Sequence, residues 1–182
     1  MEEQLKQIKA YSLSDKDIQA LLEPDTSILT YPQFADYDDI LDCFDSEGRC
    51  VFLFLTQSQS VGHWLCMFLR KGHIEYFDSY GQAPEAQREW LSKEELEELG
   101  QGERYLYNLM SKSGLPVYYN KVAYQSDKKD INTCGRWICA RLNNKDMSNA
   151  EFNDFVKDSM KEYGVKSPDD WVALYTYSFL GK

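Results

Sequence analysis

Hydrophobic positions at both ends of the chain follow a helical spacing. Residues 1–23 place apolar side chains on one face, with Ser14 as a cap and Pro24 as the stop. Glu151–Tyr163 repeats the amphipathic pattern near the other end. Ser167-Pro168-Asp169-Asp170 then has the residue types of a helix start. The spacing therefore predicts helices at both ends of the chain.

The middle of the chain changes to strand-length apolar runs. Cys50–Thr56 is continuously apolar, as in a strand that is covered on both faces. His63–Arg70 and Ile74–Phe77 read as a hairpin that turns at Lys71-Gly72. Pro116–Gln125 reads as a further strand. Together these runs predict a small central sheet.

Shorter helices and loops connect these runs. We expect a loop through Pro32, a short helix at Tyr37–Phe44, and two helices within residues 84–113, broken near Gly100-Gln101-Gly102. Thr133–Asn143 has helical spacing after a polar loop. The prediction is one α+β domain spanning residues 1–182, with a small mixed central β-sheet flanked by helices.

Composition and charge narrow the function classes. Hydrophobic residues make up 43% and aromatic residues 14% of the chain, which favours a folded core. The formal net charge of -10 disfavours a nucleic-acid partner. The apolar runs are too short to cross a bilayer, and the acidic N-terminus does not resemble a signal peptide, so we expect an intracellular, membrane-free monomer.

Cysteine and histidine usage disfavours metal binding and disulfides. The chain has five cysteines at irregular spacings, no Cys-x-x-Cys and only two histidines. A zinc site needs more regularly spaced cysteines and histidines, and a secreted disulfide scaffold needs more cysteines for its length. We therefore expect no metal, no cofactor and a reducing compartment.

One cysteine stands where a thiol becomes nucleophilic. Cys134 lies at a loop-to-helix junction, in Asn-Thr-Cys-Gly-Arg-Trp. Free N–H groups and the positive end of the helix dipole favour a thiolate there. Gly135 would let a substrate backbone approach closely. A buried structural thiol is the alternative, and we expect that role for Cys66 and Cys139.

A nucleophilic thiol needs a base and an acid that orients the base. His63 follows a polar loop at the start of a predicted strand, whereas His73 lies at the hairpin tip, where we expect it to be solvated. Asp78 follows the second hairpin strand. In an antiparallel hairpin the start of one strand lies beside the end of the other, so His63 and Asp78 should share one edge. Asp78 could instead serve only as a turn residue.

Acyl transfer also needs hydrogen-bond donors for the developing oxyanion. The backbone N–H of Cys134 would be one donor. Gln125, at the end of the predicted strand before the cysteine loop, and Asn132, two residues before the cysteine, are the candidates for the other. A solvated loop amide is the alternative for each.

The order of these residues resembles a known protease family. Gly62-His63-Trp64, Tyr76-Phe77-Asp78-Ser79-Tyr80-Gly81 and Thr133-Cys134-Gly135-Arg136-Trp137 resemble adenoviral proteinase (adenain) and the ubiquitin-like-protein-specific proteases. They look most like proteases of large DNA viruses and virophages. The resemblance extends from about residue 31 to residue 142 and implies an adenain-like fold within the papain-like superfamily, with the nucleophile at a helix N-terminus.

The resemblance also implies residue roles and a substrate class. Cys134 would be the nucleophile, His63 the general base, Asp78 its partner and Gln125 the oxyanion donor, while Trp64 would clamp a narrow substrate backbone. The Gln125-to-Cys134 spacing is longer than in many members, and Asn132 stays a candidate.

The implied activity is endopeptidase cleavage after glycine in viral capsid or core precursors. It would act in the virion and in the host cytoplasm or viral factory, with an activating peptide as a further partner. The alternatives are a deubiquitinase or modifier-processing protease with the same triad, and a non-catalytic binding module.

Overall fold

The computed structural model describes residues 2–180. Within that range the strands form one five-stranded sheet in the order β1-β2-β3-β4-β5. The outer pairs β1–β2 and β4–β5 are parallel, whereas β2–β3 and β3–β4 are antiparallel. The strands are β1 (Ser27–Thr30), β2 (Arg49–Ser58), β3 (Val61–Arg70), β4 (His73–Phe77) and β5 (Val117–Tyr119). The prediction of a mixed sheet flanked by helices is confirmed.

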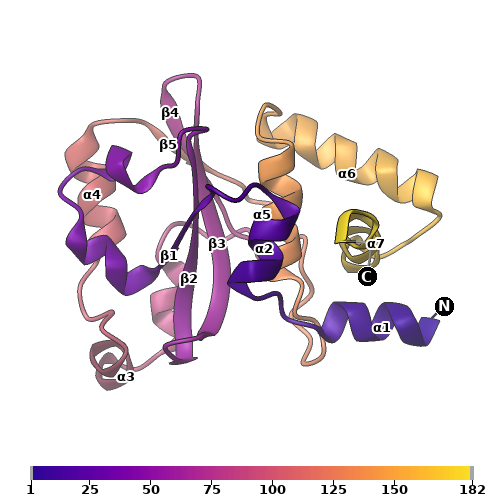
Figure 1. Ribbon diagram of the computed structural model, residues 1–182, viewed down its shortest axis with the longest axis horizontal. Coiled ribbons are helices and arrows are strands. Elements are labelled where there is room, and N and C mark those ends of the chain that lie inside the picture. Colours follow the sequence, from indigo (N-terminus) through magenta and orange to yellow (C-terminus); the bar gives the residue numbers. More distant parts are fainter. Residues whose placement is uncertain (1, 181–182) are drawn as a thin grey trace.

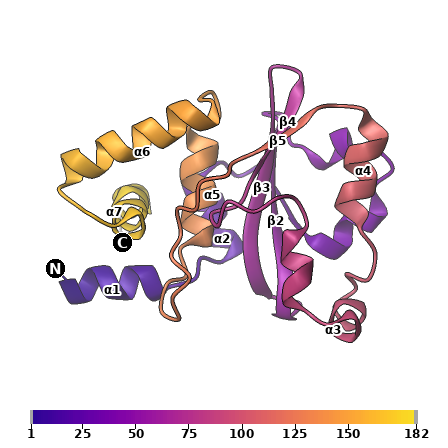
Figure 2. The ribbon, with the colours of Figure 1, turned by 180° about the vertical axis from the view of Figure 1, so that it is seen from behind.

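One face of the sheet is covered by helices from both ends of the chain (Figures 1 and 2). These helices are α1 (Glu2–Ala10), α2 (Asp15–Leu21), α5 (Cys134–Asn143), α6 (Asn149–Tyr163) and α7 (Pro168–Leu180). Helix α5 lies directly on β3 and is buried along nearly its whole length. It packs between the sheet and α7, so its first residue is held rigidly.

The opposite face carries shorter elements (Figure 1). They are the 3₁₀ helices η1 (Tyr31–Asp36), η2 (Ile40–Cys43) and η3 (Ala86–Trp90), and the α-helices α3 (Lys93–Glu98) and α4 (Tyr105–Ser113). Phe34, Phe52 and Tyr76 belong to the second core beneath them. Because β2 contributes alternate side chains to both cores, it is covered on both faces as its apolar run predicts.

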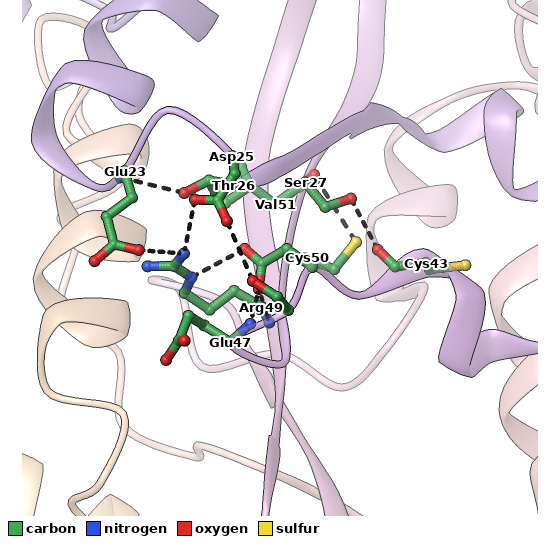
Figure 3. A network of polar contacts seen from close by, with 11 residues as sticks. Glu23, Asp25, Thr26, Ser27, Cys43, Glu47, Arg49, Cys50 and Val51 are labelled. Atoms are coloured by element: carbon green, nitrogen blue, oxygen red, sulfur yellow. Dashed lines mark hydrogen bonds and ion pairs between the residues drawn. The ribbon is translucent and has the colours of Figure 1, made fainter.

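A polar network holds the start of β2 (Figure 3). The buried Arg49 side chain donates to Glu23 at 2.9 Å and to Asp45 at 3.0 Å, and it lies 3.7 Å from Asp25. The Ser27 hydroxyl donates to the carbonyl of Cys43 at 2.8 Å. These contacts join α2, β1 and β2 at the end of the sheet opposite to His63.

The N-terminal region departs from the prediction in two places. The expected helix over residues 1–23 is two helices, because Ser14 forms a complete capping box and starts α2 afresh. The extended residues between them run towards the first turn of α5. The loop expected through Pro32 contains the edge strand β1 and the start of η1, and the helix expected at residues 37–44 is reduced to the short 3₁₀ helix η2.

Two later segments also differ. Residues 84–113 form three elements rather than two, and Gln101 fills the break by bonding both the N–H and the C=O of Leu55 at 2.9 Å. The strand expected over residues 116–125 ends at Tyr119, so Gln125 lies in a loop. After Tyr119 the side-chain amide of Asn120 takes the place of ladder bonds, because it accepts from the Asp78 N–H and donates to the carbonyls of Asp78 and Val122.

Candidate active site

The β3–β4 hairpin brings the first two candidate residues together. Its turn needs left-handed backbone, with φ of 48° at Lys71 and 79° at Gly72. The register pairs Cys66 with Phe77, so His63 and Asp78 stand at the same end of the hairpin. His63 Nε2 lies 2.8 Å from Asp78 Oδ1, and both side chains are buried.

Asp78 is held by a full set of donors. Its Oδ1 also accepts from the N–H of Tyr80 at 2.9 Å, and its Oδ2 accepts from Gln87 Nε2 at 2.8 Å. Asn120 brackets its backbone, accepting from the Asp78 N–H at 3.1 Å and donating to the Asp78 carbonyl at 2.7 Å. The carboxylate can therefore accept a hydrogen bond from the Nε2–H of His63. The other ring nitrogen, Nδ1, is then left for another partner.

Cys134 is the first residue of α5, and its thiol faces His63. Burial favours the neutral thiol. The hydrogen bond and charge of His63, with hydrogen bonds from the backbone of Trp64 and Gly135, outweigh burial and lower the pKa of Cys134. Burial also disfavours the imidazolium, but Asp78 and Cys134 raise the pKa of His63 to about 9. The pair therefore favours thiolate and imidazolium.

The two candidate oxyanion donors point to different partners. Gln125 Oε1 accepts from the Ser79 hydroxyl at 2.7 Å, and its Nε2 donates to the Ile131 carbonyl at 3.2 Å. An amide nitrogen carries two hydrogens, so Gln125 keeps one for the cleft that it lines. Asn132 instead donates through its side chain to the Ala10 carbonyl at 2.8 Å. Asn132 also keeps one hydrogen and lines the same cleft, but it is exposed, whereas Gln125 is buried and is held at both ends of its amide.

His63, Cys134 and the two candidate oxyanion amides border one cleft of about 740 Å³, called here the central cleft, and Asp78 is buried behind His63. It is lined by His63, Cys134, Gln125, Tyr80, Gln82, Trp90, Asp127, Asn132 and five further residues. A groove of about 600 Å³ adjoins it, and Ser12 and Gly62 line both. The groove is more apolar than the central cleft.

Trp64 and Gly135 lie beside Cys134 but do not line the central cleft. Trp64 is buried, donates its indole N–H to the Leu13 carbonyl at 2.9 Å, and lines the adjoining groove. A Cβ on Gly135 would stand 3.0 Å from Leu13 and 3.2 Å from Trp64. Any side chain at position 135 would therefore push these two residues away from the first turn of α5.

Aromatic rings surround His63. Tyr80 stacks on the imidazole with ring centroids 5.0 Å apart, and Trp90 meets it edge-on at 5.4 Å. Trp90 is nevertheless 40% exposed, so one side of its indole faces solvent. No pattern in the sequence indicates Trp90 as a site residue, and Tyr80 stands out only as a member of the turn after Asp78.

Asp169 is a second contributor that the sequence did not reveal. Its buried carboxylate accepts from the Thr133 hydroxyl at 2.6 Å, the Ser126 N–H at 2.9 Å and the Trp137 indole at 3.3 Å. Pro168 begins α7 as predicted, but Asp169 reaches across to α5 and the preceding loop. In the sequence, Asp169 is explained by its role at the start of a helix. No sequence pattern therefore indicates its contact with α5.

The other histidine and cysteines lie outside the cleft. His73 was expected to be solvated, but it is partly buried, because it bonds Glu75 at 3.0 Å and contacts the Tyr118 ring. Cys66 and Cys139 are fully buried, and burial raises the pKa of both thiols. Of the five thiols, Cys134 alone has a lowered pKa.

Within residues 2–180, His, Cys, Asp and Glu side chains form no cluster suited to hold a metal ion. No helix among the described residues has the length and apolar character needed to span a bilayer.

Comparisons with known proteins identify a relative from a virophage. No established protein-family profile matches the chain. Protein V9 of the Sputnik virophage, described as uncharacterized, is 35% identical over 176 residues, covering 94% of this chain and 99% of that protein. The chain therefore belongs to the family of the virophage protein V9.

The structure of the SUMO protease Ulp1, with its catalytic cysteine oxidized to a sulfinic acid, is similar over 93% of this chain and 79% of that chain. The sequence identity is 14% and the TM-score is 0.36. Because this TM-score is low, the function is inferred from the side chains of the central cleft and not from this similarity.

Proposed function

We propose that this member of the virophage V9 family is a cysteine endopeptidase with Cys134 as nucleophile, His63 as general base and acid, and Asp78 as the residue that orients His63. The supporting observation is the buried His63–Asp78 contact of 2.8 Å beside the thiol of Cys134 in a single cleft. The lowered pKa of Cys134 and the raised pKa of His63 are what an ion pair of this kind requires.

Each of these residues has a separate role in the reaction. His63 Nδ1 takes the thiol proton, and the Cys134 sulfur attacks the scissile carbonyl carbon. The Cys134 N–H and the free Nε2 hydrogen of Gln125 bind the oxyanion. His63 then gives its proton to the leaving amine, and the acyl group remains on the sulfur as a thioester. A water molecule, deprotonated by His63, hydrolyses the thioester and restores the thiol.

The proposed substrates are viral capsid or core precursor polypeptides, cut after glycine. Membership in a family with a virophage protein supports a viral substrate. Cleavage after glycine is carried over from the resemblance of the His63, Asp78 and Cys134 motifs to adenain and the ubiquitin-like-protein-specific proteases. We place the enzyme in the papain-like superfamily and expect it to act as a monomer in the virion or viral factory, with or without an activating peptide.

The experiment incubates the purified full chain with the precursor polypeptides of its own virus and maps new N-termini by mass spectrometry. Cys134→Ala is the inactive variant, and Cys139→Ala is the matched control. Cleavage by wild type and by Cys139→Ala, but not by Cys134→Ala, supports the proposal. Equal cleavage by Cys134→Ala refutes it.

Parallel labelling with ubiquitin and SUMO vinyl-sulfone probes tests the substrate class. Probe capture by Cys134 without precursor cleavage would replace virion precursors with modifier conjugates as the substrates. The catalytic assignment would stand in that case.

A further inference from the structure

The leaving-group side of the central cleft has a chemistry of its own. His63 protonates the departing amine, so the chain on that side of the cut leaves across the imidazole. Tyr80 and Trp90 pack on that imidazole, at 5.0 and 5.4 Å between centroids. Substrate residues just after the cut therefore pass over these two rings.

Trp90 presents an unoccupied face to those residues. Its ring centroid is 6.1 Å from that of Tyr80 in an edge-on contact, which fixes the indole while leaving it 40% exposed. An exposed indole face attracts a cation through the ring quadrupole, and it attracts Arg or Lys more than a neutral side chain of the same length.

The charge on the cleft wall also favours a cation. Asp127 is exposed and lines the central cleft with Tyr80 and Trp90. Burial raises the pKa of Tyr80 most, and the charges of Cys134 and Asp127 raise it further, to about 12. The negative charge of Asp127 therefore acts on the part of the wall that Tyr80 forms. No lysine or arginine lines the cleft among the described residues. Apart from the His63–Cys134 pair, in which one positive and one negative charge offset each other, the charged side chain that lines the cleft among the described residues is therefore the Asp127 carboxylate.

The geometry points to Trp90 and Asp127 as specificity residues that select a basic side chain, Lys or Arg, immediately after the scissile bond. This inference rests on the proposed peptidase function and adds its substrate class. The indole stacks on the aliphatic stem or guanidinium, and the Asp127 carboxylate pairs with the charge. A cation–π contact and one exposed ion pair together predict a preference of about 5- to 30-fold in kcat/KM over a neutral residue.

The experiment profiles cleavage of a peptide library by the full chain. A proteome is digested with a Glu-specific protease, its amines are dimethylated so that lysines keep their charge, and new N-termini are sequenced after incubation. Wild type is compared with Trp90→Ala, Asp127→Asn and Asp127→Lys. Asp130→Asn is the matched control, because Asp130 is an exposed acid of the same loop that does not line the cleft.

We expect Lys and Arg to be enriched after the cut by wild type and by Asp130→Asn. The enrichment should fall several-fold in Trp90→Ala and Asp127→Asn, and Asp127→Lys should favour Asp instead. Added salt should weaken the Asp127 contribution, because an exposed pair is screened. Trp90→Phe should restore most of the preference lost in Trp90→Ala.

Two failures are distinguishable. Cleavage without basic enrichment, or enrichment that persists in both Trp90→Ala and Asp127→Asn, overturns this inference and leaves the peptidase proposal intact. If neither the library nor the viral precursors show Cys134-dependent cleavage, the peptidase proposal fails and the inference fails with it.

Discussion

The Asp169 carboxylate joins the nucleophile helix to the loop that carries Gln125, and its replacement tests that connection. Oδ1 accepts from Thr133 and Trp137, whereas Oδ2 accepts from Ser126. In Asp169→Asn only one oxygen remains. If it stays on the α5 side, the new NH₂ group faces the Ser126 N–H, and that donor loses its acceptor.

The expected cost follows from the lost contact. A hydrogen bond to a charged acceptor contributes about 1.5–3 kcal/mol, and a buried donor left unsatisfied costs a similar amount. Ser126 is only partly buried, so we expect a loss of about 2 kcal/mol in the free energy of unfolding. Because the released loop also carries Gln125, kcat should fall as well, while KM changes little.

Urea denaturation and peptide cleavage measure the two effects on the same preparation. Asp170→Asn is the matched control: the neighbouring acid pairs with Lys9 at 2.6 Å on a partly exposed surface, which is worth less than about 1 kcal/mol. The reasoning fails if Asp169→Asn unfolds at the wild-type urea concentration, or if its kcat loss equals that of Asp170→Asn.

Three further predictions concern the cleft itself. Asp78→Asn should keep the fold but lower kcat by about 10²–10⁴, since the charge that stabilises the His63 imidazolium is lost and the one remaining oxygen cannot accept from both His63 and Gln87; unchanged kcat would contradict the assignment. Gln125→Ala should lower kcat by about 10²–10³, whereas Asn132→Ala should lower it less, and steady-state kinetics showing the reverse order would move the oxyanion role to Asn132. The pKa of His63 is raised to about 9 by Asp78 and Cys134 against the opposing effect of burial, so activity should decline as pH rises through about 9; a decline near the ordinary histidine value would refute the ion pair.

The hairpin was the part of the site that the sequence could predict. One tight turn and one register place His63 beside Asp78, and both follow from local patterns. Cys134 was predictable for the same reason, because the start of a helix is visible in a short window. These are the residues whose positions depend on nearby sequence.

The remaining contributors depend on contacts between distant segments. Asp169 reaches the nucleophile helix from α7, and Trp90 reaches His63 from η3. The Leu13 contact arises because the first helix breaks at Ser14, where the pattern suggested a continuous helix. Gln125 was expected at the end of a strand over residues 116–125, but that strand ends at Tyr119, and Gln125 lines the cleft from a loop.

The most direct test of the central claim is the pH dependence of Cys134 alkylation by iodoacetamide, followed by mass spectrometry in wild type and His63→Ala. Cys134 should react first among the five thiols and should be reactive below the pH at which an ordinary thiol ionises. His63→Ala should shift that reactivity to higher pH, because the imidazolium that lowers the pKa of Cys134 is gone. A Cys134 that alkylates only near the ordinary thiol pKa, with the same profile in His63→Ala, would contradict the claim.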